Sequence, residues 1–394
     1  MAVVAALRLS AVARGGGGLS REPTSCLQRD PPGVVHRRGW VRRDRDSAPE
    51  PEVHGRRHRN RASTARFRAP PLRMGAGAGE KRQSPFQCRP ACREPAQARR
   101  HQRALMADPT VRWPGGARAA VSVTFDNLGE AAEQELGLPT PTGRHYSVTT
   151  ALPIVLAELA DAGARATFFV EGVNTETYPD ALQSIVDAGH ECAYHAWHHE
   201  DWSRLSGAAE YENLTRGLAA MRACDLEPAG FRPPGGLIGD RTLALLQAEG
   251  LSYCSPAGEG VAIERTVLLP FAWPNVDAYH LLPQFAPLRS HIDGSVDSGG
   301  HAQVADTLMA SIDDSIANGS HATLVLHTWL IEAERDAVRA ILGHVVSAER
   351  RGALWAARCD EVAAWVQSHP DLFTDAANLD TTSWLDPSGP APAT

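Results

Sequence analysis

From about residue 117 onward, short apolar segments rich in β-branched residues alternate with longer segments of helical period. The apolar segments predict strands at 119–125, 166–170, 190–194, 229–232, 251–255, 267–271 and 321–327. The periodic segments predict helices at 148–163, 180–189, 208–224, 240–250, 304–319, 334–352 and 359–369. Repeated strand-then-helix units of this kind indicate an α/β fold around a parallel sheet, either open or closed into a barrel.

The charge distribution separates the first 105 residues from the rest of the chain. Of its 39 Lys+Arg, 23 lie in residues 1–105, beside only 8 of its 46 Asp+Glu. This Arg/Gly/Pro-rich arm cannot bury enough apolar surface to offset the entropy of folding, so we expect it to be disordered. A true start near Met106 would remove it. We expect a catalytic domain at 106–375 and a loose tail at 376–394.

Several classes of protein are disfavoured by composition. No apolar segment approaches the roughly 18 residues that a membrane helix needs, so we expect no membrane contact. The cysteines beyond the arm show no paired spacing, which favours a reduced, cytoplasmic protein. The arm could bind nucleic acid, but the acidic domain argues against a polyanionic partner. The pattern is compatible with a monomer or a homo-oligomer.

Four polar residues suited to catalysis stand at the ends of four predicted strands: Asp126, His195, Arg232 and His327. In parallel α/β folds, active residues gather at the carboxyl ends of the strands. One such placement would mean little, but four together are hard to attribute to core packing. The sequence therefore predicts that these side chains meet in one pocket.

Each residue also has a plainer interpretation. His195 and His199 could present two imidazoles to a divalent metal from one helical turn, although exposed histidines are common. Asp126 could be a general base or simply a turn residue. Arg232 could hold Asp126 in a charge-assisted bond or lie on a surface turn.

The remaining candidates concern the oxyanion and the leaving group. Gly235, in the Pro-Pro-Gly-Gly bend after Arg232, could expose a backbone N–H to an oxyanion. His327 could be a general acid or a hydrogen-bonded core histidine. Asp277 could orient the His327 imidazole and keep it protonated, or be a solvated loop residue.

Taken in order, these segments resemble the motifs of the polysaccharide deacetylase family, also called the NodB-homology or carbohydrate esterase family 4 domain. The similar segments are TFDN (124–127), HAWHH (195–199), RPPG (232–235), LVLH (324–327) and, more loosely, WPNVD (273–277). The resemblance covers about 117–370. It implies a distorted, incomplete (β/α) barrel with a divalent metal, generally zinc, at one mouth.

The resemblance also implies a role for each motif residue. Asp126 would be the base that Arg232 tethers, and His327 the acid that Asp277 supports. Gly235 would help to hold the oxyanion, while His195, His199 and the residue at position 127 would bind the metal. Here that residue is Asn127, where the family carries an aspartate. Either the metal is held more weakly, or Asp126 becomes a ligand, or no metal is bound.

The sequence thus predicts a hydrolase of a non-peptide C–N bond, acting on an N-acetyl sugar or on a small linear or cyclic amide. The segment around the two histidines is similar to the non-secreted, allantoinase-like or atypical deacetylase branch of the family. The alternative is a catalytically silent or metal-free member that binds a carbohydrate or another small ligand, which the Asn127 replacement favours. Retention of Asp126, Arg232 and His327 speaks against that alternative.

Overall fold

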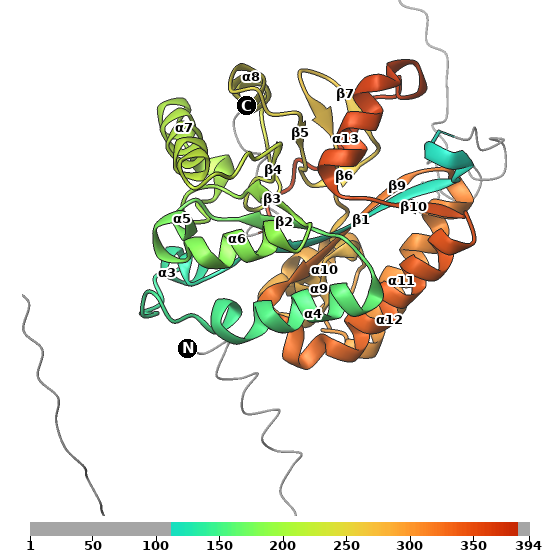
Figure 1. Cartoon of the computed structure of the whole chain (residues 1–394), viewed down its shortest axis with the longest axis horizontal. Helices are drawn as coiled ribbons and strands as arrows, with labels where there is room; N and C mark the ends of the chain where they lie inside the picture. Colours follow the sequence, from blue (N-terminus) through green and yellow to red (C-terminus); the bar gives the residue numbers. More distant parts are fainter. Residues whose placement is uncertain (1–111, 385–394) are drawn as a thin grey trace, which may run out of the picture. The chain divides into compact units, whose positions relative to one another are not determined.

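We describe residues 112–384 of a computed structural model of the chain (Figure 1). The arm predicted at 1–105 and the last ten residues of the tail lie outside this range. Within it, the parallel strands of one curled sheet are β1 (Ala119–Asp126), β2 (Thr167–Val170), β3 (Glu191–Tyr194), β4 (Gly230–Phe231), β5 (Tyr253–Cys254), β8 (Val267–Leu268), β9 (His321–His327) and β10 (Leu354–Ala356). β7 (Ala262–Ile263) adds to the β8 edge in antiparallel direction.

β1 is the central strand. It pairs with β9 along almost its whole length, and on its other side with β10 first and then with β2. From β2 the sheet continues through β3, β4 and β5 to β8. Every residue of β1 is buried, as expected for a parallel strand covered on both faces.

The gap in the barrel lies between β8 and β9. The chain just beyond β8 contacts β9 through an isolated bridge between Val276 and Val325 and through the Thr323 hydroxyl, which donates to the Pro270 carbonyl at 3.0 Å. No continuous ladder joins these strands within residues 112–384. The predicted incomplete (β/α) barrel is therefore confirmed.

Helices connect the strands. They are α3 (Ala131–Glu135), α4 (Leu152–Ala162), α5 (Asn174–Thr177), α6 (Pro179–Asp187), α7 (Gly207–Ala223), α8 (Asp240–Ala248), α9 (Asp277–Leu281), α10 (Ala286–Ile292), α11 (His301–Asn318), α12 (Ile331–Arg350) and α13 (Cys359–Ser368). Figure 1 shows α4, α12 and α11 side by side along one side of the sheet. Each long helix lies where the helical spacing of apolar residues predicts one. α4 ends at Gly163, whose φ of 69° only glycine adopts readily.

The two faces of β1 meet different surroundings. Val121, Val123 and Phe125 belong to the main apolar core beneath the helices. Ser122 and Thr124 point the other way, into the barrel interior, where they form hydrogen bonds. The interior is therefore partly polar, and there Arg232 donates hydrogen bonds to both Thr124 and Asp126.

The tail differs from its prediction as far as residue 384. β11 (Asn378–Leu379) pairs antiparallel with β6 (Gly258–Glu259), and the Asp380 N–H donates to the Ala257 carbonyl at 3.0 Å. The Pro/Asp/Thr-rich composition indicated a loose segment. One two-residue strand pairing and one backbone hydrogen bond hold this part in place instead.

Two helical glycines provide a test of the packing. A Cβ at Gly217 in α7 would come within 2.2 Å of the buried Tyr194 ring, whereas nothing lies within 4 Å of one at Gly343 in α12. We expect Gly217→Ala to lower the free energy of unfolding by about 1–3 kcal/mol through overpacking. Gly343→Ala should raise it by up to about 1 kcal/mol. Urea denaturation measures both, and equal effects would contradict the packing described for Tyr194.

Candidate active site

Strand register brings the predicted residues together in pairs. Asp126 and His327 are direct partners at the carboxyl ends of β1 and β9. Tyr194 and Phe231 are partners in β3 and β4, so His195 and Arg232, which follow them, also lie next to each other. The His195 Nδ1–H donates to the Arg232 carbonyl at 2.8 Å.

Arg232 is a buried cation inside the barrel, with 1% of its surface exposed. Its Nη1 donates to Asp126 Oδ1 at 2.5 Å and to the Thr124 hydroxyl at 2.8 Å. The Ser255 hydroxyl accepts from Nε and Nη2, and the guanidinium lies 3.9 Å above the Phe169 ring. A buried charge is tolerated only with such partners, so the guanidinium orients Asp126 rigidly.

Asp277 holds His327 through two hydrogen bonds. Asp277, at the start of α9, accepts the His327 Nδ1–H at 2.5 Å and the His327 backbone N–H at 2.7 Å. Burial lowers the pKa of His327, but the charge and hydrogen bond of Asp277 outweigh it, so the pKa is raised overall. The Nδ1 bond leaves Nε2 as the ring nitrogen available to a ligand.

His195 and His199 lie close together, but not on the helical turn that their spacing suggested. The segment 195–200 is a loop, and both Ala196 and His199 have positive φ, 63° and 67°. The ring centroids are 5.0 Å apart with planes at 70°. Burial lowers the pKa of each imidazole to about 3, so both are neutral near pH 7, the form that binds metals.

Among residues 112–384, no cluster of three or more His, Cys, Asp or Glu side chains is arranged to bind a metal ion. Asn127, the residue after Asp126, lines the same pocket as the two histidines. The Asn127 Oδ1 is buried and accepts no hydrogen bond from the described part of the chain. An orphaned buried oxygen beside two neutral imidazoles is a donor set that fits a divalent cation, although without the charge of a carboxylate.

Asn127 has a left-handed backbone, with φ of 61°, and Leu128 after it is held by Glu171, which follows β2, and by Asn174 of α5. The Leu128 N–H donates to Glu171 Oε2 at 3.1 Å, and the Asn174 amide donates to the Leu128 carbonyl at 2.7 Å. Burial raises the pKa of Glu171 to about 8. This clamp holds the backbone that presents Asn127, and it was not anticipated from the sequence.

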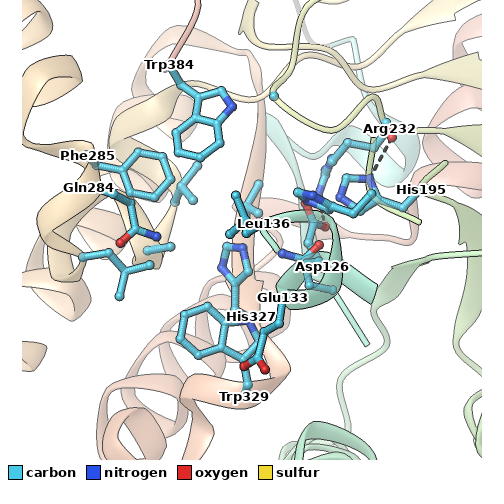
Figure 2. A pocket seen from close by; sticks show the side chains of 18 of the residues that line it. Asp126, Glu133, Leu136, His195, Arg232, Gln284, Phe285, His327, Trp329 and Trp384 are labelled. Atoms are coloured by element: carbon cyan, nitrogen blue, oxygen red, sulfur yellow. Dashed lines mark hydrogen bonds and ion pairs between the residues drawn. The ribbon is translucent and has the colours of Figure 1, made fainter. Parts of the chain in front are cut away.

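All of the predicted site residues except Asp277 line one pocket, and Asp277 lies behind His327. In Figure 2 the His327 imidazole stands between Asp126, His195 and Arg232 on one side and Phe285 and Trp384 on the other. Gly235 also lines the pocket and has a φ of 80°. The structure thus brings the predicted set together, and their chemical roles remain predictions.

Sequence reasoning missed the supporting residues and most of the pocket wall. Thr124, Ser255 and Phe169 surround Arg232, and no spacing links these positions along the chain. The aromatic side chains of the wall were also missed, including Trp384 in the tail. Aromatic residues near a Pro-rich bend could have suggested part of this wall, but nothing in the sequence connects residue 384 to it.

The fold and the pocket define a protein of the incomplete (β/α)-barrel class with acid–base groups at the carboxyl ends of its strands. Residues 115–254 match the family model described as polysaccharide deacetylase. This match bears out the resemblance of the motifs in this segment to the polysaccharide deacetylase family.

Curated relatives are similar to the same part of the chain. Chitin deacetylase 1 of Saccharomyces cerevisiae is 37% identical over 101 residues, which are 25% of this chain and 34% of that protein. A peptidoglycan-N-acetylglucosamine deacetylase of Bacillus cereus is 31% identical over 26% of this chain and 47% of its own length. The matched segments thus span less than half of either relative.

Two solved structures show the same fold. One, from Mycobacterium smegmatis and named for a polysaccharide deacetylase, has a TM-score of 0.59 at 24% identity, covering 70% of this chain and 97% of its own. The allantoinase Puue has a TM-score of 0.54 at 18% identity, covering 67% of this chain and 96% of its own.

No helix in the described range is long and apolar enough to cross a membrane.

The Glu171 clamp predicts a pH-dependent stability. Because the pKa of Glu171 is about 8 in the fold against an ordinary 4.5, its stabilising contribution is complete below pH 4.5 and is lost as the pH rises to about 8. Glu171→Gln keeps an acceptor for Leu128 but cannot ionise. We expect the free energy of unfolding of the variant, relative to the native protein, to increase from pH 5 to pH 8. Urea denaturation at both values measures it, and a pH-independent difference would show that Glu171 is ionised in the fold.

Proposed function

We propose that the protein hydrolyses a non-peptide amide bond, as a deacetylase-like enzyme. The observation that carries this proposal is the meeting of two separately oriented groups at one pocket, the Asp126–Arg232 pair and the His327–Asp277 pair. Water would add its hydroxyl to the acyl carbon and a proton to the nitrogen, so that the C–N bond breaks into a carboxylic acid and an amine. The two curated relatives named above, a chitin deacetylase and a peptidoglycan-N-acetylglucosamine deacetylase, support this reaction class.

The residues divide the proton transfers between them. Asp126, fixed by Arg232, takes a proton from the attacking water. His327 donates a proton from Nε2 to the departing nitrogen, and Asp277 stabilises the protonated ring from behind. The Gly235 backbone N–H, at the pocket wall, would stabilise the charge that develops on the carbonyl oxygen.

His195, His199 and Asn127 are the residues that would hold a divalent metal, which we infer to be zinc because two imidazoles are favoured zinc ligands. When bound, the ion supplies Lewis acidity that polarises the carbonyl and acidifies water. The weaker amide ligand lowers the expected affinity. A carbohydrate or small amide is the expected substrate, and a reduced, cytoplasmic setting is consistent with the free thiols of Cys192, Cys224, Cys254 and Cys359.

The proposed roles of the acid and the base predict large kinetic effects. We expect Asp126→Asn and His327→Gln each to lower kcat/KM on any amide substrate by about 10²–10⁴-fold. Asn is preferred to Ala at position 126, because its amide oxygen can still accept a hydrogen bond from the buried Arg232 guanidinium, whereas Ala would remove this acceptor as well as the charge and cost about 3–5 kcal/mol. Steady-state kinetics measures the loss.

His321→Gln, at the other end of β9, is the matched control. It should keep kcat/KM within a few-fold of the native value. Near-native turnover by Asp126→Asn or by His327→Gln would show that the substituted residue does not have the role assigned to it. A protein that binds amides but turns none over would favour the silent-binder alternative.

The metal site predicts an effect of the Asn127 side chain on affinity. We expect the purified protein to contain about one divalent ion per chain, and Asn127→Asp to bind zinc at least tenfold more tightly, since a carboxylate replaces a neutral donor. His199→Ala should lose the ion. Elemental analysis and calorimetric titration with zinc measure both. An active protein that contains no metal before or after Asn127→Asp would exclude this site.

A further inference from the structure

The pocket wall across from the reacting groups is apolar. It is formed by Phe271, Trp273, Val276, Leu282, Phe285 and Trp384, all of which line the same pocket as Asp126 and His327. Figure 2 shows Phe285 and Trp384 on the far side of His327 from Arg232, and Trp329 below His327. A substrate whose amide lies at Asp126 and His327 would therefore extend toward these apolar side chains.

The aromatic rings of this wall pack on one another. The Trp384 and Phe285 rings are stacked, with centroids 5.0 Å apart and planes at 27°. Phe285 contacts Trp273 at 5.7 Å, and Trp273 meets Phe271 edge-on at 5.3 Å. Because each ring is held by its neighbours, the wall is preorganised and does not have to form around a ligand.

Trp384 links this wall to the bend that contains Gly235 and follows Arg232. A Cβ at Gly235 would lie 3.0 Å from the Trp384 Nε1, so the indole lies directly against the bend that follows Arg232. The pairing of β11 with β6 fixes the chain a few residues earlier. The tail therefore contributes a flat apolar surface close to the position where the amide would react.

Hydrogen-bonding groups for a sugar are few in the described part of the lining. Apart from the residues already assigned to the proposed acid–base and metal sites, the carboxylate, imidazole and amide side chains of the lining are Glu133, His145 and Gln284. His145 Nε2 already lies 3.5 Å from Glu133 Oε1, and each of the two side chains also bonds a neighbouring hydroxyl. A sugar ring carries several hydroxyls, and burying them without partners is costly, whereas an apolar group gains by burial.

We propose that the substrate is a small amide bearing a flat apolar or aromatic group, which packs against Phe285 and Trp384 while its carbonyl faces Asp126 and His327. This inference rests on the proposed amide hydrolysis, and it defines the substrate class. The polysaccharide strand that the family name suggests is not the ligand for which this wall is built.

The test compares matched amides on the full-length, metal-loaded protein. The probes are N-acetylbenzylamine, N-methylacetamide, N-acetylglucosamine and chitotetraose. We expect kcat/KM for N-acetylbenzylamine to exceed that for each of the other three by at least tenfold. Higher kcat/KM for either sugar would overturn the substrate class and leave the proposed hydrolysis intact.

Variants locate the preference in the wall. Trp384→Ala and Phe285→Ala should each reduce the ratio of kcat/KM for N-acetylbenzylamine to that for N-methylacetamide by at least tenfold. Trp355→Ala is the matched control, because Trp355 lies on β10 and packs against Trp365 of α13, and neither lines the pocket. It should leave the ratio unchanged. An unchanged ratio in both wall variants would overturn the inference.

Binding separates the two proposals if no probe is hydrolysed. Titration of N-acetylbenzylamine by calorimetry should then still show saturable binding that Trp384→Ala weakens at least tenfold. That outcome supports the apolar site and refutes the hydrolase. Absence of binding to the native protein refutes the apolar site.

Discussion

The ion pair between Arg232 and Asp126 is the interaction on which the rest of the site depends. A guanidinium with 1% exposure can stay inside the barrel only because Asp126, Thr124 and Ser255 accept its hydrogen bonds and Phe169 covers its face. Breaking such a pair by removing one partner costs about 3–5 kcal/mol, so the pair cannot rearrange cheaply. The backbone carbonyl of Arg232 also accepts a hydrogen bond from the His195 Nδ1–H. One buried residue therefore orients the proposed base directly and one proposed metal ligand indirectly.

The incomplete barrel makes this arrangement compatible with a stable fold. Odd-numbered residues of β1 pack into the apolar core beneath the helices, while even-numbered residues face the interior, where polar groups bond one another. In the described range, only an isolated bridge and a side-chain hydrogen bond join the chain just beyond β8 to β9, so the barrel is open at this side. The segments that follow β8 there supply Asp277 behind His327 and the aromatic wall. The partner of His327 and most of the apolar wall thus come from the side at which the barrel is open.

Much of this was predictable from the sequence, and the rest was not for identifiable reasons. Hydrophobic period located the main strands and long helices, and the rule that active residues follow parallel strands singled out Asp126, His195, Arg232 and His327. Spacing misjudged the local form of His195–His199, because an i, i+4 interval does not distinguish a helical turn from a loop with two positive φ angles. The Glu171 clamp and the position of Trp384 in the pocket wall depend on contacts between distant segments of the chain. Neither the periodicity of apolar residues nor the composition reveals such contacts. Composition also made the tail up to residue 384 look loose, because β11 is only two residues long.

The central claim is that Asp126 and His327 act on one substrate in one pocket, and a double-mutant cycle on kcat tests it most directly. If both act in the same reaction, Asp126→Asn and His327→Gln each remove most of the acceleration, and the double variant should be no more than about threefold slower than the slower single variant. If the two losses instead multiply in the double variant, the residues act independently and the shared acid–base pocket described for this protein is contradicted.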